Sequence, residues 1–139
     1  MMLDQVTVFL ENDKGRLSAL TRVLSDADIN MYALTIAETS DYGLVRIVCN
    51  KPEAAVKALR AADMRASVTE VVAVTVPNRP GGLAELLQKF EELDLNIDYG
   101  YCFSVAGEEA VDVLKVSDAK RASEALAAAG YRLVTSEDL

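Results

Sequence analysis

The segment VTVFLENDKGRL, residues 6–17, decides the fold because it recurs 66 residues later as VAVTVPNRPGGL, residues 72–83. Each copy begins with alternating apolar residues, which is typical of a strand with one buried face. An asparagine and a glycine follow at the same spacing, and a leucine then opens an apolar pattern of helical period. A strand, a glycine-containing loop and an amphipathic helix are therefore predicted twice.

The repetition extends beyond this segment and covers the chain. At the same shift Val45 falls on Val111, and one inserted residue follows before the match resumes. A period of this length indicates a duplicated small domain rather than a solenoid. We therefore predict two domains, residues 1–70 and residues 71–139.

Each copy continues in the same order after its first helix. A second strand begins near residues 29–31 and 95–97, and a hairpin joins it to a third strand, residues 43–49 and 110–116. Another helix and a short last strand complete each copy. The order β-α-β-β-α-β, present twice, predicts an α+β fold of two ferredoxin-like units packed side by side, each with helices on one face of an antiparallel sheet.

Composition and charge limit the possible partners. The chain has 139 residues, and its 14 basic and 22 acidic side chains give a net charge of −8. Such a chain repels phosphate backbones and anionic membranes, so we expect no nucleic-acid or membrane partner. No apolar run approaches the ~18 residues of a membrane span, and the start lacks the pattern of a signal peptide. A cytoplasmic protein is the expectation.

The reactive residue types are scarce. Histidine is absent, which excludes Ser-His-Asp and Cys-His mechanisms and His-ligated metal sites. Cys49 and Cys102 lie in separate apolar stretches without a CxxC motif, which predicts two buried residues in a reducing compartment, with a disulfide or redox pair as the alternative. We therefore expect a protein that is not an enzyme and uses no cofactor and no metal.

Three segments carry a resemblance to a known family: residues 9–17, residues 37–43 and residues 76–84. Together with the Ile-Asn-Met and Asn-Ile that open the second strands, they resemble the ACT domain. More narrowly, the chain resembles stand-alone bacterial and archaeal proteins made only of two ACT repeats. Lys14 departs from the pattern, since the family usually has proline there, as Pro80 does in the second copy.

The resemblance implies a regulatory module that performs no chemistry. Such a module binds a small ligand, usually a free amino acid, at the interface of paired ACT units. In most relatives the pair is attached to a biosynthetic enzyme, so here the output is expected to pass to a separate metabolic enzyme. A homodimer of the two-repeat chain is also implied.

The loops before the first helices suit an α-amino acid. Helix N-termini carry unpaired N–H groups and a partial positive charge, which favour a carboxylate. Gly15, Gly81 and Gly82 let a ligand approach the backbone closely. The side-chain oxygens of Asn12 and Asn78 are suitable acceptors for the ligand's ammonium.

The two loops are not equivalent, because Asp13 in the first copy corresponds to Arg79 in the second. Different affinities or different ligands are therefore expected. In side-by-side ACT pairs, the start of the second strand faces the loop of the neighbouring unit. We therefore expect residues 96–98 to meet the first loop and residues 30–32 to meet the second. The predicted ligand-binding residues are Asn12, Asp13, Lys14, Gly15, Arg16, Leu17, Asn30, Met31, Tyr32, Asn78, Arg79, Pro80, Gly81, Gly82, Leu83, Asn96, Ile97 and Asp98.

These residues also have purely structural alternatives. Asn12 and Asn78 can cap a helix or shape a turn, and Asn30 and Asn96 can satisfy a strand-entry turn. The loop glycines can be required by backbone angles alone.

Other features leave their role open. Tyr99, Tyr101 and Phe103 alternate along one strand and fit a core or subunit contact, or a pocket wall. Residues 39–43 fit a hairpin turn whose role in ligand or partner contact is open.

Two other functions remain possible at this point. One is an assembly module that keeps the ACT scaffold without a ligand. The other is a small acylphosphatase-like hydrolase, in which Arg79 would hold phosphate and Asn78 would orient water.

Overall fold

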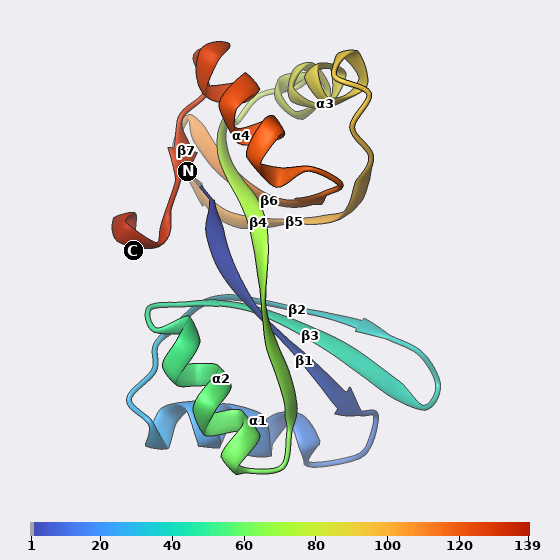
Figure 1. Cartoon of the computed structure of the whole chain (residues 1–139), viewed down its shortest axis with the longest axis vertical. Coiled ribbons are helices and arrows are strands. Elements are labelled where there is room, and N and C mark those ends of the chain that lie inside the picture. Colours follow the sequence, from blue (N-terminus) through green and yellow to red (C-terminus); the bar gives the residue numbers. More distant parts are fainter. Residues whose placement is uncertain (1) are drawn as a thin grey trace. The chain divides into compact units, whose positions relative to one another are not determined.

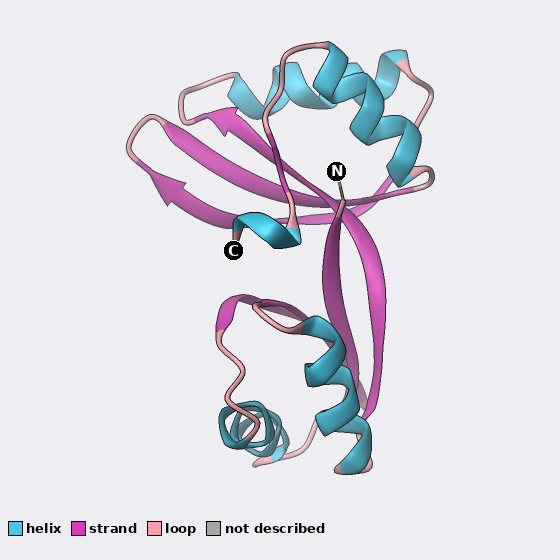
Figure 2. Cartoon of the chain, turned by 60° about the vertical axis from the view of Figure 1, so that its left-hand side comes forward, coloured by secondary structure: helices cyan, strands magenta, loops and turns pink. Residues whose placement is uncertain are grey.

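The computed structural model describes residues 2–139. The chain divides into two compact units. The first unit comprises Asp4–Thr69, and the second comprises Glu70–Leu139 together with the start of the chain up to Leu3. Strand β4 (Arg65–Pro77) ends the first unit and opens the second, as Figure 2 shows.

The first unit has the predicted order. Its elements are β1 (Leu3–Glu11), α1 (Arg16–Asp26), β2 (Met31–Glu38), β3 (Tyr42–Cys49), α2 (Pro52–Ala61) and the start of β4. The strands follow the order β2-β3-β1-β4, and both helices lie on one face of the sheet (Figure 1). Val6 and Val8 of β1 and Leu20 and Leu24 of α1 are fully buried in the core between these layers.

The second unit repeats this arrangement. Its elements are the end of β4, α3 (Gly82–Glu92), β5 (Ile97–Ala106), β6 (Glu109–Val116), α4 (Ala119–Ala128), β7 (Leu133–Val134) and a short 3-10 turn (Ser136–Asp138). The strands follow the order β5-β6-β4-β7, and α3 and α4 cover one face. Val74, Leu86, Phe90 and Leu126 form the centre of its core. The predicted α+β fold with two β-α-β-β-α-β repeats is confirmed.

The predicted correspondence of Val45 with Val111 is wrong. In the first unit Val8 of β1 faces Val45 of β3, whereas in the second unit the equivalent Val74 faces Asp112 of β6. The inserted residue therefore lies before this position, toward the hairpin. The sequence does not reveal where the inserted residue lies, because the third strand of the second copy is rich in valine. An alignment shifted by one residue still matches apolar residues to apolar residues, although it exchanges the two faces of the strand.

The insertion is accompanied by an irregular register in β5, between Cys102 and Ser104. As a result, Asp112 lies on the helix-facing side of the sheet, at the position of the fully buried Val45. Asp112 is half-buried, and desolvation raises the pKa of its carboxyl group.

The two cysteines differ in environment. Both are free, Cys49 is buried, and Cys102 is exposed. Burial raises the pKa of the Cys49 thiol, although a backbone hydrogen bond at Lys51 acts in the opposite direction. The prediction of two buried cysteines is therefore wrong for Cys102. The reason is its place in β5, a strand at the end of the sheet that the helices leave uncovered.

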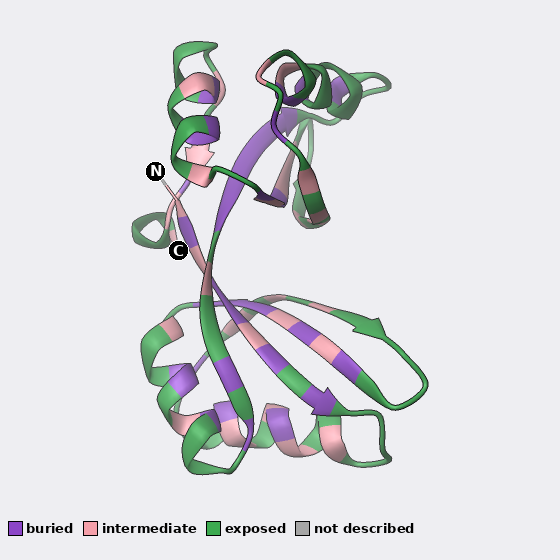
Figure 3. Cartoon of the chain, turned by 45° about the vertical axis from the view of Figure 1, so that its right-hand side comes forward, coloured by how far each residue is buried: buried purple, intermediate pink, exposed green. Residues whose placement is uncertain are grey.

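Buried residues alternate with less buried ones along much of β1 and β3, whereas residues 71–76 of β4 are all buried. The outward sides of the helices are exposed (Figure 3). Among residues 2–139, no helix is both long enough and apolar enough to cross a lipid bilayer.

Candidate ligand-binding site

The loop before α1 is fastened to the β2–β3 hairpin. The backbone N–H of Asn12 donates to the Asp41 carbonyl oxygen at 3.2 Å, and its side-chain Nδ2 donates to the Thr39 carbonyl oxygen at 3.1 Å. Gly15 then adopts a left-handed conformation with φ of 87° directly before the helix. A side chain at this position would be strained, so the glycine is required by the backbone itself.

The loop before α3 has the same construction. The Asn78 N–H donates to the Glu108 carbonyl oxygen at 2.7 Å, and Asn78 Nδ2 donates to the Gly107 carbonyl oxygen at 3.0 Å. Gly81 has a φ of 86°. The capping alternative for the two asparagines is therefore wrong, because each side-chain amide binds a hairpin instead of a helix end. The side-chain Oδ1 atoms of Asn12 and Asn78 are therefore the atoms that can accept a hydrogen bond at the loops.

The N-termini of α1 and α3 lack a side-chain cap within the described residues, and glycine occupies the cap position of each. By contrast, the Asp118 side chain caps α4 by accepting from the Arg121 N–H at 3.1 Å. The amide groups in the first turns of α1 and α3 are thus the places where an external acceptor can bind. Carboxylates are favoured there by the helix dipole.

The charges at the two helix starts differ. Arg16 begins α1, and its Nε is buried without a hydrogen-bond partner in the part of the chain that the structure describes. The equivalent residue at α3 is Gly82, and Arg79 in that loop binds Glu85 at 3.2 Å. Glu85 lies in the first turn of α3, whereas the first turn of α1 has no acidic residue. The first loop is therefore the better site for a carboxylate.

The predicted residues at the strand entries lie away from these loops. Asn30 follows the C-terminus of α1, so the 11 residues of the helix separate it from Gly15 by about 16 Å. The backbone N–H of Asn30 donates to Asn50 Oδ1 at 3.0 Å, so this group takes no part in the loop before α1. In the second unit Asn96 Nδ2 donates to Asp98 Oδ1 at 3.0 Å. Within one unit, the two groups of predicted residues are not brought together.

A groove recurs at these strand entries. The groove of the first unit has a volume of about 370 Å³ and is lined by Thr21, Ser25, Asp28, Ile29, Asn30, Met31 and Asn50. The groove of the second unit has a volume of about 450 Å³ and is lined by Leu87, Phe90, Glu91, Asp94, Leu95, Asn96 and Ile97. Both grooves are open to solvent, so neither encloses a small molecule by itself. The sequence analysis predicted residues 30–31 and 96–97 at these grooves. It did not predict the helix residues that line them, because the sequence alone does not show which helix side chains lie beside the strand entries.

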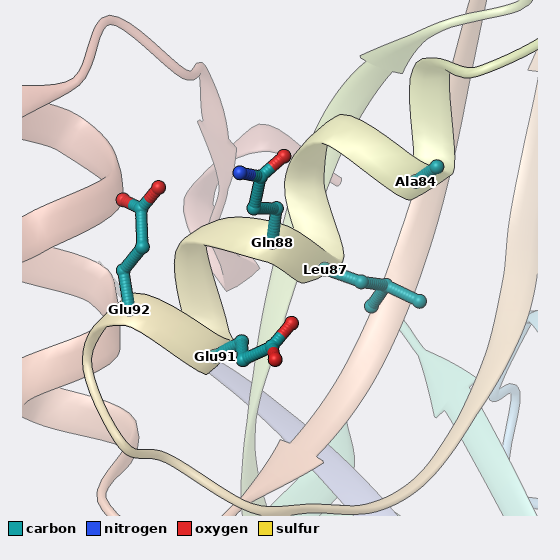
Figure 4. A pocket seen from close by; sticks show the side chains of 5 residues that line it. All are labelled: Ala84, Leu87, Gln88, Glu91 and Glu92. Atoms are coloured by element: carbon teal, nitrogen blue, oxygen red, sulfur yellow. The ribbon is translucent and has the colours of Figure 1, made fainter.

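Another hollow lies along α3 and was not predicted. Figure 4 shows its five lining side chains, which all come from this helix: Ala84, Leu87, Gln88, Glu91 and Glu92. The two carboxylates repel a carboxylate ligand, and the lining includes no basic side chain. Among residues 2–139, no three His, Cys, Asp or Glu side chains gather closely enough to hold a metal ion.

Comparison with known protein families matches residues 1–139 to the ACT domain pair. The chain belongs to the ACT domain pair family. Protein BT0572 from Bacteroides thetaiotaomicron is similar at 35% identity with a TM-score of 0.93, over 99% of this chain and 95% of that chain. Comparison with curated proteins gave no match.

More distant structures share the fold of this ACT domain pair. The regulatory subunit of aspartate kinase from Thermus thermophilus, in its ligand-free form, has a TM-score of 0.65 at 13% identity and covers 91% of each chain. The regulatory subunit of aspartate kinase from Thermus flavus has a TM-score of 0.61 at 16% identity, over 92% of this chain and 94% of that chain. At these identities the likeness concerns the fold alone.

Proposed function

We propose that this ACT domain pair is a non-catalytic regulatory module of the cytoplasm that binds a free amino acid and acts on a separate metabolic enzyme. The observation that carries the proposal is the repeated loop: an uncapped helix N-terminus that follows a left-handed glycine and an asparagine bound to a hairpin. That the aspartate kinase subunits of similar fold are named regulatory supports the regulatory part of the proposal.

The carboxylate of the ligand binds the first-turn amides. At α1 these amides belong to residues such as Leu17 and Ser18, and Arg16 adds a positive charge with an unpartnered Nε. A hydrogen bond to a charged group contributes roughly 1.5–3 kcal/mol. At α3 the ligand relies on backbone amides, because Gly82 replaces the arginine and Glu85 already pairs with Arg79.

The ammonium group binds the asparagine oxygen. Since Asn12 Nδ2 is held by the Thr39 carbonyl oxygen, the amide is oriented with Oδ1 as the end that accepts a hydrogen bond from a ligand. The exposed carboxylate of Asp13 contributes a second attraction in the first loop, and Asn78 repeats the asparagine role in the second. Asn96 and Asp98 of a neighbouring unit supply the opposite wall.

Thermal unfolding in the presence of each common amino acid at millimolar concentration tests this function. A ligand at one hundred times its Kd stabilises the folded state by about 2.7 kcal/mol, which raises Tm by several degrees for a chain of this size. Arg16→Ala and Asn12→Ala are expected to lose most of this shift, whereas Lys57→Ala, an exposed change on α2, keeps it. If no amino acid changes Tm and calorimetry detects no binding heat, the module has no amino-acid ligand and assembly alone is its function.

The cross-pairing of the two walls has its own test. Asn12→Ala and Asn96→Ala are compared by calorimetry with the amino acid that gives the largest shift. Both changes are expected to weaken the same binding event. If one abolishes binding and the other leaves every site unchanged, the two residues do not belong to one site.

A further inference from the structure

A hollow of about 740 Å³ lies in the first unit, where α2 ends and β4 begins (Figure 1). Three apolar side chains line it: Phe9, Leu44 and Met64. Phe9 and Leu44 face each other across β1 and β3, and they alternate with the core residues Val8 and Val45. They therefore lie on the side of the sheet that the helices leave uncovered. The hollow is open to solvent, and none of the predicted ligand-binding residues lines it.

Two arginines border this hollow, and each is held in place by a contact within the first unit. Arg60 Nε donates to the Ala66 carbonyl oxygen at 2.9 Å, which joins the end of α2 to β4. Arg65 lies over the ring of Phe9, with its guanidinium carbon 5.4 Å from the ring centroid. The Phe9 ring is in turn stacked on Tyr42, with the centroids 4.6 Å apart. Because both arginines are already ordered, a partner that binds them pays less conformational entropy.

The charge of the two arginines is not neutralised by the chain itself. Within residues 2–139, neither Arg60 nor Arg65 forms an ion pair, and their terminal guanidinium nitrogens have no hydrogen-bond partner. Asp63 also lines the hollow, so the charged side chains of the lining sum to +1 in a chain of net charge −8. A planar guanidinium binds a carboxylate through two parallel N–H donors. The hollow is therefore complementary to a negatively charged group.

The second unit lacks this arrangement at the corresponding place. Its hollow has a volume of about 410 Å³, and its lining includes Thr75, Glu109 and Arg132. Arg132 corresponds to Arg65 of the first unit, but it is bound to Glu109 at 2.7 Å. Thr75 stands where the first unit has Phe9. The available guanidinium groups are thus a property of the first unit and not a requirement of the fold.

The shape of the hollow favours a protein segment over a small molecule. Small-molecule sites bury most of the surface of their ligand, whereas this hollow is open. A peptide segment covers an open hollow because it continues beyond it on both sides. Arginine and aromatic side chains are also the residue types enriched at protein–protein interfaces.

We propose that this hollow docks an acidic segment of a partner protein, in which an apolar or aromatic side chain is flanked by aspartate or glutamate. The apolar side chain packs on Phe9 and Leu44, and the flanking carboxylates bind Arg60 and Arg65. The apolar contact supplies buried area, and the two guanidinium groups select carboxylates over neutral or basic segments.

The stack of Arg65, Phe9 and Tyr42 leads from the hollow to the first ligand loop. Tyr42 follows the hairpin residues Thr39 and Asp41, whose carbonyl oxygens accept hydrogen bonds from Asn12. The docking surface is therefore connected to the loop before α1. Its use to report a bound amino acid rests on the proposed function, whereas docking itself needs no amino acid.

An array of synthetic nine-residue peptides tests the docking in the absence of amino acids. Each peptide has a central leucine, phenylalanine or tryptophan flanked by glutamates or aspartates, and a matched peptide carries glutamine or asparagine instead. The full chain is expected to bind acidic peptides at least tenfold more tightly than their amide counterparts, as measured by fluorescence polarisation. The affinity is expected to fall as the salt concentration rises.

Three variants and one control locate the binding. Arg60→Gln and Arg65→Gln are each expected to weaken the best acidic peptide at least tenfold, because a charge-assisted hydrogen bond is lost. Phe9→Leu is expected to weaken it less, since it keeps an apolar contact and removes the ring under Arg65. Arg22→Gln removes the same charge from an exposed position on α1 and is expected to leave the affinity unchanged. The Tm of each variant shows whether it is folded.

An NMR titration of the wild-type chain gives a readout that needs no substitution. The largest ¹H–¹⁵N shifts with the best acidic peptide are expected at Phe9 and at residues 65–67. Shifts centred on Arg132 and the hollow of the second unit would overturn the proposal.

Other outcomes also overturn it. Equal binding of acidic and amide peptides, or no binding of either, shows that the hollow does not dock an acidic segment, and so does unchanged binding by both arginine variants. Displacement of the peptide by millimolar glutarate shows that the occupant is a small dicarboxylate. A lower mass of Arg65→Gln in light scattering, without peptide binding by the wild type, shows that a second copy covers the hollow. None of these results changes the thermal shift with amino acids, so failure of the docking and failure of the proposed function are distinguishable.

Discussion

The two units share the backbone of their loops and differ in the chemistry on it. Gly15 and Gly81 have φ values within one degree of each other, and Asn12 and Asn78 bind equivalent hairpins. The next residue is Arg16 in the first unit and Gly82 in the second. After the duplication, the conformation that exposes the helix N-terminus was retained, while the charge around it changed.

The core shows a second divergence. A fully buried valine of the first unit, Val45, corresponds to the half-buried Asp112 of the second. A carboxylate is tolerated at the second position because it retains contact with solvent. The two positions are therefore equivalent in the fold and opposite in their tolerance of charge.

The largest effect is expected from Val45→Asp. The new carboxylate would be buried without a partner, at a position that is 0% exposed, and a loss of about 3–5 kcal/mol of unfolding free energy follows. The matched change Asp112→Val is expected to alter stability by less than about 1 kcal/mol, in the stabilising direction. Urea denaturation of both variants measures the contrast. Equal losses of unfolding free energy would show that the two positions do not differ in their tolerance of charge.

Gly82→Ala comes next in size. An added Cβ would lie 2.2 Å from the Pro77 carbonyl oxygen, which is backbone and cannot move away cheaply. We expect a loss of about 1–3 kcal/mol in unfolding free energy. Arg16→Ala at the equivalent position of α1 is expected to cost less than Gly82→Ala while it weakens ligand binding. A Gly82→Ala variant as stable as wild type would contradict the close approach.

The smallest effect concerns the pH dependence of stability. Desolvation raises the pKa of Asp112 above its ordinary value of 3.8, so the folded state holds this proton more tightly than the unfolded state does. The Asp112 carboxyl group therefore favours folding at pH values below its ordinary pKa of 3.8. This contribution is lost as the pH rises through the pKa of the folded state. Because the half-buried carboxyl keeps part of its contact with solvent, the change is expected to be small.

Asp112→Asn measures this contribution directly. The variant's Tm is expected to exceed that of the wild type by more at pH 7 than at pH 3, because asparagine lacks the charge that forms at high pH. A gap that is larger at pH 3 would mean that the carboxylate is stabilised in the folded state.

The order of the elements was predictable because the apolar pattern is strong and occurs twice. The α+β class follows from alternation and period alone. The position of the insertion was not predictable, because β6 is rich in apolar residues and alignments that differ by one residue each match several of them to the apolar residues of β3. Exposure of Cys102 depends on which strand ends the sheet, which is a tertiary property.

The residue types of the candidate site were predictable from the sequence, whereas their hydrogen bonds were not. The asparagine and glycine spacing located both loops. The partner of each asparagine amide is a hairpin carbonyl about thirty residues away along the chain, and such a contact leaves no local pattern. The ion pair between Arg79 and Glu85 could not be predicted either, because it depends on how the first turn of α3 orients Glu85 toward the loop.

The proposed function requires that the N-termini of α1 and α3 bind the carboxylate of a free amino acid. The most direct measurement is a ¹H–¹⁵N NMR titration with the amino acid that raises Tm most, beside the same compound with its carboxylate converted to a carboxamide. The largest amide shifts are expected at Gly15–Ser18, with smaller ones at the start of α3, and the carboxamide is expected to bind clearly more weakly. Shifts confined to other surfaces, such as the outer face of α3, or equal affinity for the two compounds would contradict it.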